Sequence, residues 1–116
     1  MNTLRVTALL LLCCTIVGCR SRVVRVNLVN SSAQPITVIT VDYPGASFGV
    51  EQLNPGKTFL YPIKPQETGP LKIQFTDANG HSHNFTGPTL NKNDEGSLEI
   101  RLDQQGATAK LSLGGQ

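Results

Sequence analysis

This sequence contains no tryptophan and few cysteines and charged residues, and the lack of tryptophan argues against one class of function. The 116 residues include three cysteines, no tryptophan, two tyrosines and four phenylalanines, and 16% of them are charged. Sugar-binding surfaces usually need exposed flat aromatic rings, so the lack of tryptophan disfavours a carbohydrate site. The Gly-x-Ser-x-Gly motif of many serine hydrolases is also missing. We therefore expect neither an enzyme nor a bound cofactor, although a Ser-His-Asp site assembled from distant residues leaves no trace in sequence.

A run of apolar residues at the N-terminus is too short to cross a bilayer. It extends from Val6 to Val17 and follows the positive charge of Arg5. A membrane-spanning helix needs about 20 apolar residues. A shorter apolar run after a basic start is typical of a secretory signal peptide, which is removed from the mature protein. The sequence therefore predicts an exported protein.

A four-residue motif closes this run. Ile16-Val17-Gly18-Cys19 resembles the lipobox of bacterial lipoproteins, in which an aliphatic residue, a tolerant position and Gly or Ala precede a cysteine. The resemblance covers the signal segment only. It implies cleavage after Gly18, transfer of lipid to the Cys19 thiol and acylation of the new amino terminus. The alternative is an ordinary secretory signal in which the cysteine has no such role.

Lipidation of Cys19 would set the location of the protein. Two or more acyl chains anchor a protein stably, whereas one chain does so only marginally. The lipoprotein resemblance implies at least two chains, and therefore a permanent anchor in a bacterial membrane. The next residue is Arg20 rather than the Asp that favours retention in the inner membrane. By this resemblance we expect the outer membrane, facing the periplasm, if the bacterium has two membranes.

The mature chain is short and nearly neutral. Removal of the signal peptide, residues 1–18, leaves 98 residues with nine basic and eight acidic side chains, so attraction to nucleic acid is not expected. The other two cysteines leave with the signal peptide, and the domain must be stable without a disulfide. Residues 19–22 form a tether that reaches about 12–14 Å when extended. The nearby Arg20, Arg22 and Arg25 either attract anionic lipid headgroups or belong to a solvated tether.

The rest of the chain alternates apolar and polar residues with the period of β-strands. In the segment 23–29, for example, Val24, Val26 and Leu28 share one face. About eight such segments, separated by turn-forming residues, predict one all-β domain over 23–113. A polar loop is expected over 87–96, and residues 114–116 should fray. We expect a single immunoglobulin-like antiparallel β-sandwich, although the Cys and Trp markers of that fold are missing.

The only two histidines lie in one predicted strand. Residues two apart in a strand point to the same side, so His81 and His83 could hold Zn²⁺ or Cu²⁺ with a third ligand such as Asp77. The alternative is a pair of solvated histidines on a hairpin arm. Residues 91–96 imitate the start of an EF-hand loop, but Leu102 stands where a bidentate glutamate is required. That segment predicts a polar connection between strands.

Two aromatic residues flank a predicted turn. Tyr43 and Phe48 stand on either side of Pro44-Gly45, which makes them candidates for contact with a partner. The alternative is that both rings fold inward and cap the core. Taken together, these patterns predict a non-enzymatic binding or assembly module, anchored through Cys19, that docks onto another envelope protein. A periplasmic metal-binding protein using His81 and His83 is the alternative function.

Overall fold

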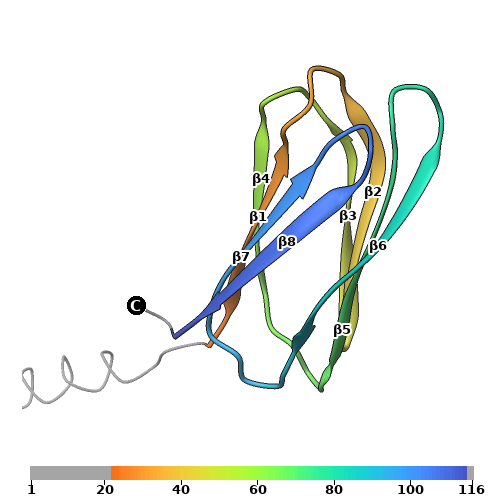
Figure 1. Ribbon diagram of the computed structural model, residues 1–116. Helices are drawn as coiled ribbons and strands as arrows, with labels where there is room; N and C mark the ends of the chain where they lie inside the picture. Colours follow the sequence, from red (N-terminus) through yellow and green to blue (C-terminus); the bar gives the residue numbers. More distant parts are fainter. Residues whose placement is uncertain (1–21, 115–116) are drawn as a thin grey trace, which may run out of the picture.

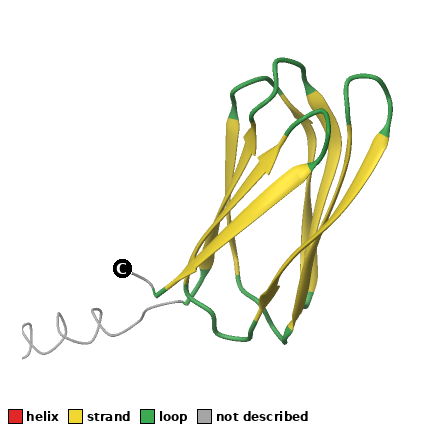
Figure 2. Ribbon diagram, viewed as in Figure 1, coloured by secondary structure: helices red, strands yellow, loops and turns green. Residues whose placement is uncertain are grey.

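The computed structural model describes residues 22–114, and this part of the chain contains only strands, turns and loops (Figures 1 and 2). Eight strands follow one another: β1 (Val24–Asn30), β2 (Ile36–Tyr43), β3 (Ala46–Leu53), β4 (Thr58–Ile63), β5 (Gly69–Thr76), β6 (Ser82–Leu90), β7 (Gly96–Leu102) and β8 (Ala107–Leu113). The all-β class predicted from the alternation is confirmed.

The strands form two four-stranded sheets that pack face to face. One sheet has the strand order β4-β1-β7-β8, and the other has the order β3-β2-β5-β6. Neighbouring strands are antiparallel except β1 and β7, which run parallel. Two parallel neighbours cannot be joined by a short turn and need a long crossover connection. Between β1 and β7 the chain passes through β2 to β6, which include the whole second sheet and β4.

The core lies between the sheets and is built from the alternating residues. Val24, Val26 and Leu28 are at most 1% exposed, as their spacing predicts. The other buried apolar residues of the core, from both sheets, are Ile36, Ile39, Val41, Phe48, Leu53, Ile63, Leu71, Ile73, Phe75, Leu90, Leu98, Ile100 and Leu102. Burial of one such side chain contributes about 1.5–3 kcal/mol. This core supports the fold without a disulfide, since all three cysteines lie outside the described residues.

A bulge interrupts the alternation of β2. The pairing of β2 with β5 shifts between Thr37 and Thr40, and Val38 has a φ of 50° and is 65% exposed. A β-branched residue seldom adopts a positive φ. The extra residue allows Ile36 and Ile39, three positions apart, both to be buried in the core.

Strand β6 is longer than the sequence predicts. The polar loop expected over 87–96 is wrong at both ends, because β6 continues to Leu90 and β7 already begins at Gly96. Leu90 is fully buried and pairs with Gly69, which favours continued pairing over a loop. The register shifts between Pro70 and Lys72, where Gly87 and Pro88 of β6 lie opposite the single residue Leu71 of β5. An edge strand tolerates proline at such an irregularity.

The β-sandwich is confirmed, whereas an immunoglobulin order of strands is not. In the seven-stranded immunoglobulin domain, the first, second, fifth and fourth strands form one sheet. Here β1 and β2 lie in different sheets, and β1 pairs with β4 and β7 instead. Local alternation specifies which face of a strand is buried but not which strand becomes its neighbour.

Candidate functional site

The two ends of the sandwich differ in what they carry. The described chain enters β1 at one end, where β8 also finishes (Figure 1). We call this the N-terminal end. The opposite end, called the far end below, gathers the four connections β1–β2, β3–β4, β5–β6 and β7–β8, which are residues 31–35, 54–57, 77–81 and 103–106. Loops grouped on a rigid scaffold are common positions for binding sites.

Asn30 joins two of the far-end loops from inside the domain. Its side chain is completely buried and makes four hydrogen bonds. The Nδ2 group donates to the carbonyl oxygens of Gln34 (2.8 Å) and Leu53 (2.9 Å). The Oδ1 atom accepts from the backbone N–H of Ser32 (2.9 Å) and from its hydroxyl (2.7 Å). The backbone of Asn30 also bonds residues 56 and 57, so the β1–β2 and β3–β4 loops are held together.

Gln104 connects the same network to the other two loops. Its Nε2 donates to the hydroxyl of Ser32 at 3.0 Å, and its Oε1 accepts from the backbone N–H of Ala78 at 2.8 Å. Ser32, Ala78 and Gln104 belong to three different loops of the far end. The four loops are therefore braced by one chain of hydrogen bonds, which keeps their exposed side chains in fixed relative positions.

Asp77 is a buried carboxylate at the base of the β5–β6 hairpin. Its side chain is 3% exposed, and its Oδ1 accepts from the backbone N–H groups of Asn79 (2.9 Å) and His81 (3.0 Å). Its Oδ2 lies 2.8 Å from His83 Nε2. An ionised carboxylate only accepts hydrogen bonds, so Nε2 of His83 is the donor. Stacking on Phe75, with ring centroids 5.0 Å apart, fixes the orientation of the His83 ring.

The structure brings both predicted histidines toward the third group considered for a metal. His81 is 76% exposed, and its Nδ1 lies 3.7 Å from Asp77 Oδ2. The nearer nitrogen, on His83, is already hydrogen-bonded to that same oxygen. Within residues 22–114, no group of three His, Cys, Asp or Glu side chains has an arrangement suited to a metal ion. This geometry gives His83 a structural role, as the hydrogen-bond donor to Asp77. Metal binding by His81 and His83 stays a prediction.

The contacts of Asp77 predict a dependence of stability on pH. Chiefly the hydrogen bond from His83, and then that from the His81 N–H, lowers the pKa of Asp77 below its usual value of 3.8. A carboxylate with a lowered folded-state pKa stabilises the fold above the unfolded-state pKa, and this contribution disappears as pH falls through the folded-state pKa. We expect Asp77→Asn to unfold at lower urea than the wild type at pH 6, with the difference shrinking as the pH falls below 3.8.

Urea unfolding followed at pH 6, 4, 3 and 2.5 checks this expectation. Asp103→Asn is a matched control because it removes one exposed carboxylate from another far-end turn, where Asp103 Oδ1 accepts from residues 105 and 106. A constant gap between wild type and Asp77→Asn over this pH range would contradict the assigned role of the Asp77 charge.

The aromatic pair expected to contact a partner lies mostly inside. Phe48 is 8% exposed and stacks on Tyr61 with ring centroids 4.4 Å apart. Tyr43 is half-buried against the core, and burial, followed by the neighbouring Tyr61, raises its pKa. Phe59 packs beside these rings and helps to close the edge between β3 and β4. The arrangement fits the alternative in which the rings cap the core, and it leaves Tyr61 as the more exposed ring.

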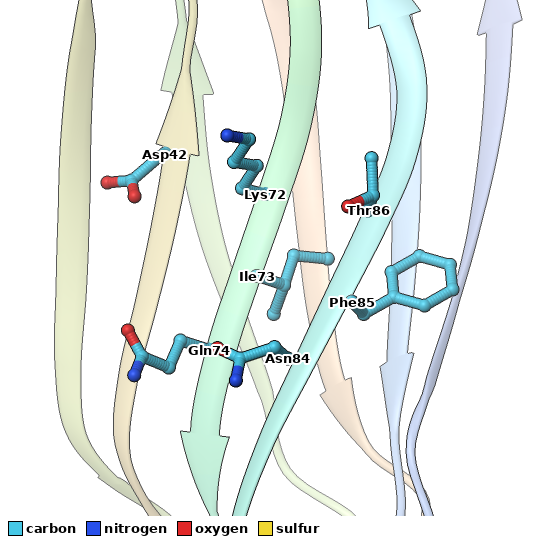
Figure 3. A pocket seen from close by; sticks show the side chains of 7 residues that line it. All are labelled: Asp42, Lys72, Ile73, Gln74, Asn84, Phe85 and Thr86. Atoms are coloured by element: carbon cyan, nitrogen blue, oxygen red, sulfur yellow. The ribbon is translucent and has the colours of Figure 1, made fainter.

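A shallow hollow of about 150 Å³ lies over β2, β5 and β6 (Figure 3). Asp42, Lys72 and Thr86 form one cross-strand row, and Gln74 and Asn84 form part of the next. These five polar side chains are all exposed. The hollow offers hydrogen-bonding groups but does not enclose a ligand, and its polar groups resemble an ordinary solvated sheet face.

The predicted lipidation site lies outside the described residues. Gly18 and Cys19 precede residue 22, where the description of the chain begins. In the described range no helix is long and apolar enough to span a membrane.

Sequence reasoning missed Asn30, Ser32 and Gln104. The segment Asn30-Ser31-Ser32 reads as a turn by composition, and an Asn side chain that bonds the backbone two residues later is a known turn signal. That signal predicts the contact with Ser32. The link from Gln104 to Ser32 joins residues 72 positions apart and has no local signature.

Comparison with known proteins gives the fold and no family. No family model matches the chain, and no curated protein matches it. A protein from Eubacterium rectale, with a structure determined by NMR, is similar with a TM-score of 0.59 and 15% sequence identity. The match covers 84% of this chain and 97% of that chain. At this identity the similarity concerns the fold alone.

Proposed function

We propose that this protein is a bacterial lipoprotein, anchored through Cys19, that acts as a non-enzymatic binding module for another envelope protein. The observation that carries the proposal is the Ile16-Val17-Gly18-Cys19 motif, which ends three residues before the described domain begins. By the lipoprotein resemblance, Arg20 after the cysteine favours the outer membrane, facing the periplasm, in a bacterium with two membranes.

The far end is the surface that we assign to the partner. A chain anchored at Cys19 enters the domain at the N-terminal end, so the far end is directed away from the tether (Figure 1). Its loops are braced through Asn30, Ser32 and Gln104. Loops that are already ordered lose less conformational entropy on binding, which favours affinity. The exposed side chains available there include Lys57, Asn79 and Gln105.

Photocrosslinking in intact cells tests both parts of the proposal. A photoreactive amino acid is placed at Asn79 or Gln105 in the far end, or at the exposed Glu67 or Lys92 of the N-terminal end as matched controls. We expect a discrete crosslinked partner from the far-end positions only. With Cys19→Ser the protein should take up no labelled palmitate, leave the membrane fraction and lose the crosslink.

The outcomes separate the anchor from the docking surface. Palmitate labelling that persists in Cys19→Ser would contradict lipidation at this residue. Crosslinks that come equally from the far end and from Glu67 or Lys92 would contradict the assignment of the far end, even if lipidation is correct.

A further inference from the structure

An apolar patch interrupts the polar surface of the first sheet. The described residues expose four large apolar side chains, namely Val38, Leu60, Tyr61 and Leu113. Leu60 faces outward on edge strand β4 and is 68% exposed. Tyr61 lies on the inner face, where it stacks on Phe48, but it is still 37% exposed at the open edge of the sandwich. Pro62 follows them and is exposed too. With Arg25 and Asn27 of β1, these residues line an open hollow of about 220 Å³. We call Leu60, Tyr61 and Pro62 the β4 patch.

Basic side chains border the β4 patch on the side of the N-terminal end. Arg25 pairs in register with Pro62, and Val24 pairs with Ile63. Lys64 directly follows Ile63, and Arg22 lies two residues before Val24; both are exposed. The only acidic residue on the outer face of this sheet, among the residues described, is Glu99, which is bonded to Arg101 at 2.9 Å. The patch thus has a basic border without a neighbouring free carboxylate on that face.

The other sheet has the opposite character. Its outer face carries Asp42 and Glu51 against Lys72, together with neutral polar residues and the exposed Val38 of the β2 bulge. An anionic surface would therefore attract the first sheet and not the second. The charge pattern distinguishes the two faces although the domain as a whole is nearly neutral.

We propose that the β4 patch rests on the anionic lipid surface in which Cys19 is anchored. This inference depends on the lipidation proposed above. Four residues, 19–22, can span at most about 12–14 Å. Leu60 pairs with Asn27, only about 10 Å along β1 from Val24. The patch is therefore within reach of the bilayer to which the chain is attached. Tyrosine, leucine and basic side chains are suited to the boundary between headgroups and acyl chains.

A second protein strand fits this edge less well than lipid does. Pro62 lacks a backbone N–H, and proline on an edge strand opposes the addition of a further strand. The neighbouring arginine and lysine stems can cover apolar lipid while their charged groups remain at the headgroups. The apolar residues of the patch match the acyl chains of an anionic bilayer, and its basic border matches the headgroups.

The test uses the processed, lipidated protein in vesicles. Once the signal peptide is removed and Cys19 is acylated, a single introduced cysteine can carry an environment-sensitive fluorophore. Leu60→Cys probes the β4 patch, and Val38→Cys is the matched control because it is 65% exposed and lies on the other sheet. Vesicles contain phosphatidylcholine with or without 30% phosphatidylglycerol, and brominated acyl chains serve as the quencher.

We expect at least two-fold stronger quenching by brominated lipid at Leu60→Cys than at Val38→Cys, and more quenching when phosphatidylglycerol is present. Arg25→Glu should reduce this difference. Equal quenching at the two positions in vesicle-bound protein would overturn the inference and leave the lipid anchor intact. A blue-shifted Leu60→Cys emission that bromine does not quench would also overturn it, because a protein would then cover the patch. Failure of the chain to remain with vesicles would contradict the lipidation proposal itself.

Discussion

Replacement of Gly96 by alanine is expected to destabilise the domain by about 4 kcal/mol. Gly96 begins β7 with a φ of 154°, which L-residues rarely adopt. A Cβ atom there would collide with the carbonyl oxygen of Ser112 and would lie 2.8 Å from the Cα of Leu113. Both are backbone atoms of β8 and cannot move aside as a flexible side chain would.

The position of Gly96 enlarges this effect. It pairs with Val24 of β1 on one side and with Leu113 of β8 on the other. Relief of the collision must therefore open the pairing of β7 with β8, near the place where β1 begins. Natural domains are stable by only about 5–15 kcal/mol, so a loss of this size removes a large share of the total.

Urea unfolding of purified variants measures the effect. Gly106→Ala is the matched control, because a Cβ at Gly106 meets no atom within 4 Å and that change should stay within about 0.5 kcal/mol of wild type. If both alanine variants unfold at the same urea concentration, the proposed collision at the start of β7 is wrong.

Strand positions could be predicted because burial has a period of two. The alternation of Val24, Val26 and Leu28 places them on one face, and the core confirms that assignment. The bulge at Val38 could not be predicted, because every residue around it is a good strand former. The extension of β6 to Leu90 was hidden by Gly87 and Pro88, which usually indicate a loop. Both the bulge at Val38 and the extension of β6 are determined by buried contacts with residues of other strands.

Strand neighbours and the braced loops depend on long-range contacts. The parallel pairing of β1 with β7 joins segments about 70 residues apart, and no local pattern specifies it. The same applies to the hydrogen bond from Gln104 to Ser32. The grouping of Asp77 with the two histidines was easier to anticipate, because all three belong to one hairpin. The role of His83 still differs from the metal ligand that the sequence pattern suggested, because His83 donates a hydrogen bond to Asp77 rather than facing an open ligand position.

The exposure of Tyr61 shows why alternation does not predict burial reliably on an edge strand. Alternation groups Phe59, Tyr61 and Ile63 on one face, and Ile63 is indeed 1% exposed. Tyr61 remains 37% exposed because β4 has a neighbour on one side only. Leu60 lies on the opposite, outward face of β4, and its exposure together with that of Tyr61 at the edge creates the patch that we assign to the lipid surface.

Substitution of Asn30 by alanine should cost about 3 kcal/mol, the second large effect that we expect. The change removes all four side-chain hydrogen bonds and leaves the carbonyl of Leu53, bonded within the interior at 2.9 Å, without its donor. A single exposed hydrogen bond contributes only about 1 kcal/mol, so the burial of Asn30 is what raises the cost. Asn30→Asp should be worse still, because it keeps the acceptor, loses both donors and places a charge in the core.

Chemical denaturation compared with Asn84→Ala tests this ranking. Asn84 is exposed on the outer face of β6, and its removal should change the free energy of unfolding by no more than about 0.5 kcal/mol. Hydrogen exchange adds a local readout, since the amides of Ser32 and Ala78 should lose protection in Asn30→Ala ahead of those in β7. Equal stability of Asn30→Ala and Asn84→Ala would show that the far-end loops are held by their strands rather than by Asn30. The preordered partner surface proposed here would then lose its physical basis.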